Sequence, residues 1–195
     1  GRKTKRAGGY MTYMPVYHSP FVFANFNGTS GDVDVITHEC GHAFQRYISG
    51  MDPIREHADI TMETAEIHSM SMEFFTQKWM QLFFGDRADD YTKMHLEDAV
   101  IFILYGCMVD EFQHIVYENP HLTPGERRDA WLKLEAEYRP HQDDDGDEFF
   151  SKGGFWQKQH HIYSSPFYYI DYCLAQTCAL QYKMKMEEDF REAWE

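Results

Sequence analysis

The sequence His38-Glu39-Cys40-Gly41-His42 lies inside an amphipathic run over residues 32–49. Four residues make just over one turn of an α-helix, so the two histidines project from the same face of the helix. Two imidazoles held in this way can occupy two corners of a tetrahedral zinc site, which leaves room for a third ligand and a water molecule. Glu39 lies beside them and can take a proton from that water without binding the metal. The stretch therefore predicts a helix with a catalytic zinc site.

The same five residues can also occur by chance in a helix that binds no metal, but their surroundings favour the metal site. Gly41 costs about 1 kcal/mol inside a helix, which indicates that another segment approaches closely at this point. Asp32 and Asp34 place negative charge in the first turn, where it is stabilising, and Thr29 or Ser30 is the expected N-cap.

The third ligand is expected from a second helix, which begins near residue 56 or 60 and ends near 84. A helix packed against the first one would bring one of its acids, Glu63, Glu66 or Glu73, beside the two histidines. Glu66 and Glu73 lie two turns apart on one face, so one could bind the metal while the other supports a ligand. Glu63 could equally be a solvated acid, and His68 is expected to be a hydrogen-bonded structural histidine. Spacing alone does not choose among the acids.

Residues 1–31 form the one part of the chain that is not predicted to be helical. Residues 21–26 alternate loosely between large apolar and small or polar side chains before the turn at Asn27-Gly28, which predicts a short strand. This strand could be an exposed edge that binds a peptide substrate through its main chain. It could also be a buried strand that only packs.

The rest of the chain is also predicted to be helical. Residues 89–117 form a long helix whose centre, residues 100–109, is apolar all round and is therefore expected to be buried. Thr123 and Glu126 have the spacing of a capping box, which opens a helix that ends near Tyr138. Residues 139–154 are acidic and end in two glycines, as in a solvated surface loop with a hinge.

The C-terminal part contains a candidate second set of functional residues. His160-His161 is followed by Ser165-Pro166, the expected start of a last helix, in which Tyr169 and Tyr172 are three residues apart and share a face. Phenols donate hydrogen bonds at neutral pH, which is what a developing oxyanion requires. The alternative is an aromatic helix face that packs in a core.

The composition limits the possible classes of function. The chain has 195 residues with a net charge of −14, which excludes a nucleic-acid partner that needs a basic face. Four dispersed cysteines indicate reduced thiols in a cytoplasmic protein. The sequence predicts no signal peptide, and its longest apolar run is too short to span a membrane. Both ends look cut within structured sequence, so we expect a fragment.

Three motifs in the same order resemble the oligoendopeptidase F branch of the thimet oligopeptidase family. The first is the zinc helix with the loop and strand before it, beginning at Gly8-Gly9-Tyr10-Met11. The second is Thr64-Ala65-Glu66-Ile67-His68-Ser69 with Glu73 beyond it. The third is the run His161-Ile162-Tyr163-Ser164-Ser165-Pro166-Phe167-Tyr168-Tyr169-Ile170-Asp171-Tyr172. The resemblance covers nearly the whole chain from Gly8 onward.

The resemblance implies a mainly α-helical, zincin-type metallopeptidase with a short β segment near the N-terminus. It would make residues 1–195 a single catalytic domain that lacks the N-terminal helical part of the family. It also implies the following roles: His38, His42 and Glu66 as ligands of one Zn²⁺ per chain, Glu39 as general base, Glu73 as support for a ligand, and His161, Tyr169 and Tyr172 at the scissile carbonyl. Apart from the resemblance, the expected edge strand predicts that the substrate main chain is bound by Phe23, Ala24, Asn25, Phe26, Asn27 and Gly28.

The predicted function is zinc-dependent hydrolysis of peptide bonds in oligopeptides, with a zinc-bound water as nucleophile and Glu39 as base. Neither nucleic acid nor membrane is expected as a partner. A different class remains open, namely a zinc- or peptide-binding module that catalyses no reaction. Glu39 favours the enzyme, because a purely structural zinc site would use a fourth protein ligand and keep no open position.

Overall fold

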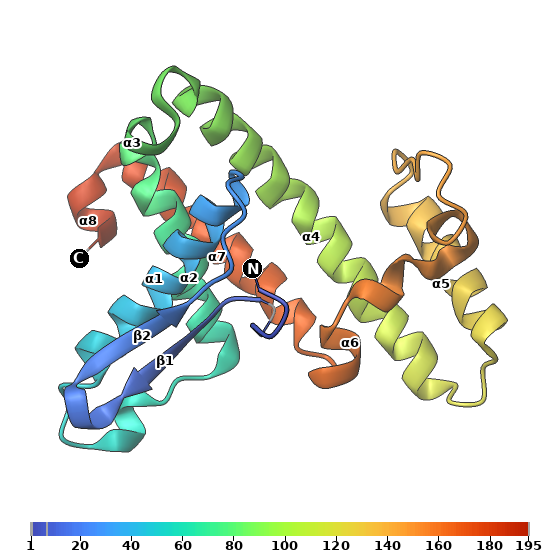
Figure 1. Cartoon of the computed structure of the whole chain (residues 1–195), viewed down its shortest axis with the longest axis horizontal. Helices are drawn as coiled ribbons and strands as arrows, with labels where there is room; N and C mark the ends of the chain where they lie inside the picture. Colours follow the sequence, from blue (N-terminus) through green and yellow to red (C-terminus); the bar gives the residue numbers. More distant parts are fainter. Residues whose placement is uncertain (1, 7, 195) are drawn as a thin grey trace. The chain divides into compact units, whose positions relative to one another are not determined.

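The computed structural model describes residues 2–6 and 8–194. The strands are β1 (Tyr10–Met14) and β2 (Ser19–Phe23), and the α-helices are α1 (Gly31–Ser49), α2 (Met62–Phe75), α3 (Gln81–Phe84), α4 (Ala88–Glu118), α5 (Pro124–Tyr138), α6 (His161–Ser164), α7 (Tyr169–Glu188) and α8 (Phe190–Trp194). Short 3₁₀ turns cover Pro15–Tyr17, Arg55–Ala58, Thr76–Trp79, Gly85–Arg87 and Phe155–Lys158. The mainly helical fold with a small β segment near the N-terminus is confirmed (Figure 1).

The chain divides into two compact units. The first consists of Gly1–Leu96 together with Leu174–Glu195, and the second is Glu97–Cys173. The two long helices α4 and α7 each contribute residues to both units. The predicted zinc helix therefore belongs to the first unit, whereas His161 and the two tyrosines belong to the second.

In the first unit, β1 and β2 form an antiparallel hairpin that contacts α1 (Figure 1). The register pairs Tyr10 with Phe23 and Met14 with Ser19. The predicted strand over residues 21–26 is therefore wrong at both ends, because β2 begins earlier and its last paired residue is Phe23. Sequence reasoning also missed its partner β1, since pairing between strands depends on residues that are distant in sequence.

α1 has the predicted extent, but its N-terminus is not capped as expected. Ser30 occupies the N-cap position without a side-chain hydrogen bond to the helix. The Asp32 carboxylate instead accepts hydrogen bonds from the backbone N–H groups of Asn27 and Gly28, the latter at 2.7 Å. Asp32 thereby ties the end of the preceding segment to the first turn of α1.

The predicted second helix is broken into three pieces. α2 ends at Phe75, a 3₁₀ turn follows, and α3 ends at Phe84, directly before Gly85, whose φ of 54° is in the region that favours glycine. The Thr76 hydroxyl donates to the carbonyl of Glu73 at 3.0 Å, a local bond that competes with regular helix. One continuous helix to residue 84 was therefore a wrong prediction.

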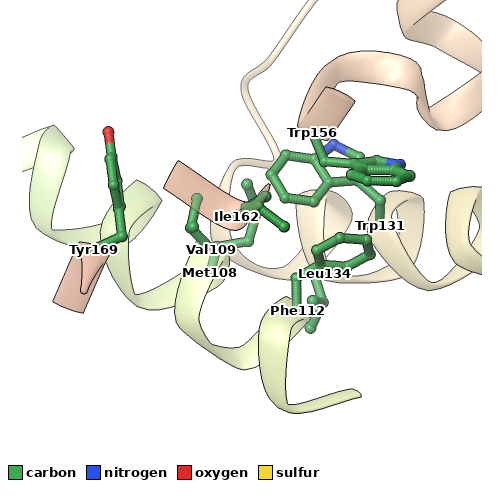
Figure 2. Packing of buried hydrophobic residues seen from close by; sticks show 8 residues of the cluster. All are labelled: Met108, Val109, Phe112, Trp131, Leu134, Trp156, Ile162 and Tyr169. Carbon is green, nitrogen blue, oxygen red and sulfur yellow. The ribbon is translucent and has the colours of Figure 1, made fainter. Parts of the chain in front are cut away.

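The second unit has a core of aromatic and aliphatic side chains from α4, α5, α6 and the turns between them. Figure 2 shows Phe112, Leu134, Trp131 and Trp156 packed together, with the Tyr169 hydroxyl at the edge directed away from the other labelled side chains. Phe112 and Trp131 are fully buried, and their rings meet edge to face at 5.2 Å. α5 begins with the predicted capping box and ends at the predicted residue, because both signals are local.

The prediction that residues 100–109 are buried all round is wrong. Met108 and Val109 are fully buried in this core, but Val100, Ile101 and Leu104 are 53%, 42% and 46% exposed. One face of α4 packs on the core, and the described residues do not cover the other face.

The last helix also begins later than predicted. Ser165-Pro166 does not open α7, because Phe167 adopts a left-handed conformation with φ of 62°. The backbone N–H of Phe167 donates to the Gln113 side chain at 2.8 Å, which holds this break in place. The four-residue helix α6 precedes the break and carries His161.

Residues 81–118 are helical over most of their length and apolar enough to cross a membrane by length and composition alone. A third of the most apolar window is buried inside the structure. The core helix of a soluble protein passes the same test, so this feature is weak evidence for a membrane span.

Candidate metal centre

α1 presents His38 and His42 on one face, as the spacing predicts. Their rings meet edge to face with centroids 5.0 Å apart. Between them, Gly41 lies against α2: a Cβ at this position would be 2.6 Å from the Cα of Ser69 and 2.7 Å from the carbonyl oxygen of His68. Any side chain here would push the two helices apart, so Gly41 permits the close approach that brings α2 to the histidines.

Glu66 is the acid on α2 that reaches both histidines. Its Oε2 lies 3.2 Å from Nε2 of His38 and 3.6 Å from Nε2 of His42. Glu66 is only 5% exposed, and the Ser69 hydroxyl donates to the same oxygen at 3.0 Å. One donor atom from each of the three residues lies within 4.8 Å of the other two, so the atoms can share a single metal ion. Two histidines and one carboxylate are a donor set that zinc uses in catalytic sites.

The other two acids on α2 have different positions. Glu63 is exposed on the surface, as a solvated acid would be. Glu73 accepts a hydrogen bond from Nδ1 of His38 at 2.7 Å and lies 2.8 Å from Nε2 of His95 on α4. A carboxylate bonded to the second nitrogen of a histidine fixes the orientation of its ring and leaves Nε2 for a metal. Nδ1 of His68 lies 2.8 Å from the carbonyl oxygen of Thr64, a local contact within α2.

The charges around His38 favour a cation. Burial alone would lower the pKa of His38, but the flanking carboxylates of Glu66 and Glu73 outweigh it and raise the pKa to about 10. Burial lowers the pKa of His42 to about 4, so this imidazole is neutral and can bind a metal. Burial opposes ionisation of Glu73, yet its bonds to His38 and His95 lower its pKa overall. Two buried carboxylates beside two imidazoles therefore fit a divalent cation.

Glu39 lies next to this group, buried to 8% exposure. Burial raises its pKa, and the nearby Glu66 carboxylate adds to the increase while His38 opposes it. A carboxylate with a raised pKa is a stronger base, as proton abstraction near neutral pH requires. Glu39 lines a small open pocket of about 200 Å³, together with Gly9, Asp34, Val35, His38 and Glu73.

The predicted substrate segment, residues 23–28, joins β2 to α1. Phe23 stacks on Tyr10 at 5.0 Å, and the Asn25 side chain donates to the backbone carbonyls of Arg6 and Gly8, both at 2.8 Å. The N–H groups of Asn27 and Gly28 already donate to Asp32. Main-chain pairing with a substrate would thus use the part of the segment before Asn27.

In the second unit, His161 lies close to both predicted tyrosines. Its ring centroid is 5.1 Å from that of Tyr169 and 5.7 Å from that of Tyr172. Tyr169 is 9% exposed and belongs to the core in Figure 2, and burial raises its pKa. Its side chain therefore packs in the core whatever its further role, whereas Tyr172 lies at the edge of that core. His160 differs from His161 because it is exposed and bonded to Ser164.

The profile of peptidase family M3 matches residues 1–193. The chain belongs to peptidase family M3. The resemblance inferred from the three motifs is thereby confirmed.

Solved structures agree with the membership in family M3. The chain is 55% identical to PZ peptidase A, solved with an inhibitor, over 99% of its length with a TM-score of 0.94. A structure that carries the name oligoendopeptidase F matches with the same identity, coverage and TM-score. Another of that name, from Bacillus anthracis, is 50% identical over 100% of this chain with a TM-score of 0.84. No match was found among curated proteins.

This M3 chain spans about a third of the length of the structures it matches: 34%, 34% and 31% of those chains. Sequence reasoning had named Glu66 and Glu73 as candidate partners of the two histidines on α1, but it had missed His95, which shares Glu73 with His38. No spacing rule could have found this residue, because its partner lies 22 positions away on another helix. Gln159, bonded to His161, was missed for a different reason: an amide carries no motif of its own.

Proposed function

We propose that this chain is the catalytic region of a zinc-dependent oligoendopeptidase, which hydrolyses peptide bonds in short peptides. The observation that carries the proposal is the convergence of His38, His42 and Glu66 on one point, with Glu39 beside them on the same helix. Membership in family M3 supports a peptidase. We propose one zinc ion per chain, with those three residues as its ligands.

Zinc in such a site supplies a Lewis acid that polarises the scissile carbonyl and lowers the pKa of a water molecule. Glu39 would accept the proton of the attacking water and return it to the leaving amine. Glu73 would keep the His38 ring in the orientation that leaves Nε2 for the metal. His161, Tyr169 and Tyr172 are proposed to donate hydrogen bonds to the carbonyl oxygen as it becomes negative, and residues 23–28 to bind the substrate main chain.

The net charge and the cysteines support proposals for the partners and for the cellular location. The net charge of −14 supports the proposal that oligopeptides, and neither nucleic acid nor a membrane, are the partners. None of the four cysteines, all of which lie in the described part of the chain, forms a disulfide, which supports a cytoplasmic location, where thiols stay reduced.

Metal analysis of two matched variants tests the ligand set. Glu66→Ala should lose zinc, with an affinity loss beyond the roughly 10–100-fold expected for a residue that only supports a ligand. Glu63→Ala removes an exposed acid from the same helix and should keep one zinc per chain. The reverse result would refute the assignment of Glu66.

Cleavage of a fluorogenic peptide, with and without a chelator, tests the reaction. Turnover that disappears with the chelator and returns with zinc supports the proposal. A chain that binds zinc stoichiometrically but cleaves no peptide would instead be a binding module.

A further inference from the structure

The hydrogen bond between Gln159 and His161 indicates which ring nitrogen of His161 carries the proton. Nδ1 of His161 lies 2.7 Å from the side-chain nitrogen of Gln159. An amide nitrogen donates hydrogen bonds and does not accept them, so Nδ1 of His161 is the acceptor in this contact. A neutral imidazole that accepts at Nδ1 carries its proton on Nε2.

The orientation of the Gln159 amide is set by Tyr105 on α4. The Tyr105 hydroxyl donates to Oε1 of Gln159 at 2.9 Å. Burial raises the pKa of Tyr105 to about 12, so the phenol keeps its proton at neutral pH and remains a donor. If the amide were reversed, its NH₂ group would face the phenol, and the phenol proton would lose this acceptor.

Tyr105 and the Gln159 backbone are both held by contacts within the second unit. The Tyr105 ring meets Tyr169 edge to face at 5.9 Å, and the Arg139 guanidinium lies over the Tyr105 ring at 5.2 Å. The backbone N–H of Gln159 donates to the carbonyl of Trp156 at 3.0 Å, directly after the turn Phe155–Lys158. The chain Tyr105–Gln159–His161 therefore extends from a packed core to an imidazole.

We propose that Gln159 is a positioning residue that holds His161 in the tautomer with its proton on Nε2, and that Tyr105 orients the Gln159 amide. In this tautomer Nε2 of His161 is a hydrogen-bond donor. A donor is the type of group that stabilises a peptide carbonyl as it gains negative charge, and this last step rests on the proposed peptidase function.

Nitrogen-15 NMR of the histidine-labelled chain tests the proposal without any substrate. Protonated and unprotonated ring nitrogens have separate shifts, and a His161→Gln variant identifies the His161 signals. In the wild-type chain, at a pH where the ring is neutral, Nε2 should be protonated and Nδ1 unprotonated. A protonated Nδ1 in the wild-type chain would overturn the proposal.

The decisive variant is Gln159→Glu. A carboxylate only accepts hydrogen bonds, so Nδ1 of His161 should change from an unprotonated to a protonated nitrogen. Gln157→Glu makes the same change of charge at an exposed position two residues away and should leave the wild-type pattern. An unchanged Nδ1 in Gln159→Glu would refute the role of Gln159.

Tyr105→Phe keeps the ring and removes only the phenol proton that orients the amide. It should convert the single wild-type pattern into a mixture of the two tautomers, and it keeps the proposal testable if Gln159→Glu does not fold. A pure wild-type pattern in Tyr105→Phe would refute the role of Tyr105.

Kinetics separate this proposal from the peptidase function on which its last step rests. If peptides are cleaved, Gln159→Glu should lower kcat about tenfold to a hundredfold and change KM little, because the donor matters mainly in the transition state. A chain that cleaves no peptide but shows the shift at Nδ1 would refute the peptidase and keep the positioning role. A chain that cleaves peptides but shows no change at Nδ1 in Gln159→Glu would keep the peptidase function and refute the positioning role.

Discussion

The group around His38 and the core around Trp131 both bury large side chains, but the two regions do so with opposite chemistry. Around His38, acids and imidazoles are buried together and joined by hydrogen bonds and ion pairs, such as those of Glu73 with His38 and His95. Around Trp131, the contacts are between rings and aliphatic groups, and Phe112 and Trp131 have no exposed surface.

The two regions therefore contribute differently to metal binding and to the stability of the fold. Buried charges cost desolvation energy that their mutual attraction only partly offsets, so a cluster such as that around His38 adds little to folding. Buried apolar surface is the main favourable term in folding, at about 25 cal/mol per Å². Substitutions in the first region should therefore mainly change metal binding or turnover, and substitutions in the second should mainly change the free energy of unfolding.

The largest effect is expected from Glu39→Gln. The amide keeps the size of the side chain but cannot take a proton, so kcat for a fluorogenic peptide should fall about 10²–10⁴-fold, while zinc content and Tm stay near the wild-type values. Glu63→Gln is the matched control on an exposed surface. A loss below about tenfold would rule out a general-base role for Glu39.

Phe112→Ala tests the contribution of the apolar core around Trp131 to stability. It should lower the free energy of unfolding by about 3–5 kcal/mol, measured in urea, because it leaves a cavity in a fully packed core. Val100→Ala, at an exposed position of the same helix, should change it by no more than about 0.5 kcal/mol. Similar losses from both variants would mean that the exposed face of α4 is covered in solution.

Tyr172→Phe tests whether a residue at the edge of the aromatic core also contributes to peptide hydrolysis. If its hydroxyl donates to the oxyanion, its loss should cost about 2.7–4 kcal/mol of transition-state stabilisation, or a hundredfold or more in kcat, with a modest change in KM. Tyr169→Phe is the comparison at a buried position. An unchanged kcat in the complete enzyme with Tyr172→Phe would assign this residue to packing alone.

The smallest effect is expected from His95→Gln. Loss of this partner should leave Glu73 less well held against His38, and zinc affinity should fall about 10–100-fold while turnover at saturating zinc is retained. Competition with a coloured chelator measures the affinity. His57→Gln replaces an exposed histidine that pairs with Asp52, and it should bind zinc like the wild type. Equal affinities for both variants would show that His95 does not support the site.

Local signals in the sequence were enough to predict much of the helical fold. The extent of α1 and both ends of α5 follow from helical periodicity and from a capping box, in which all interacting groups are three or four residues apart. The motif from His38 to His42 in α1 is local in the same way, because its residues lie within about one helical turn. The errors fall where distant residues intervene: the end of β2 depends on its pairing with β1, and the break at Phe167 is held by Gln113, 54 residues away.

The sequence by itself determined that two histidines share a helix face, that Glu39 lies between them, and that an acid from a second helix should join them. Only the tertiary structure decided that Glu66 reaches both histidines, that Glu73 bonds to His38 and His95, and that Gln159 bonds to His161. The physical reason is geometric. Periodicity places a side chain on a face of its own helix, but the rotation and approach of the neighbouring helix depend on packing, here on the contact of Gly41 with α2.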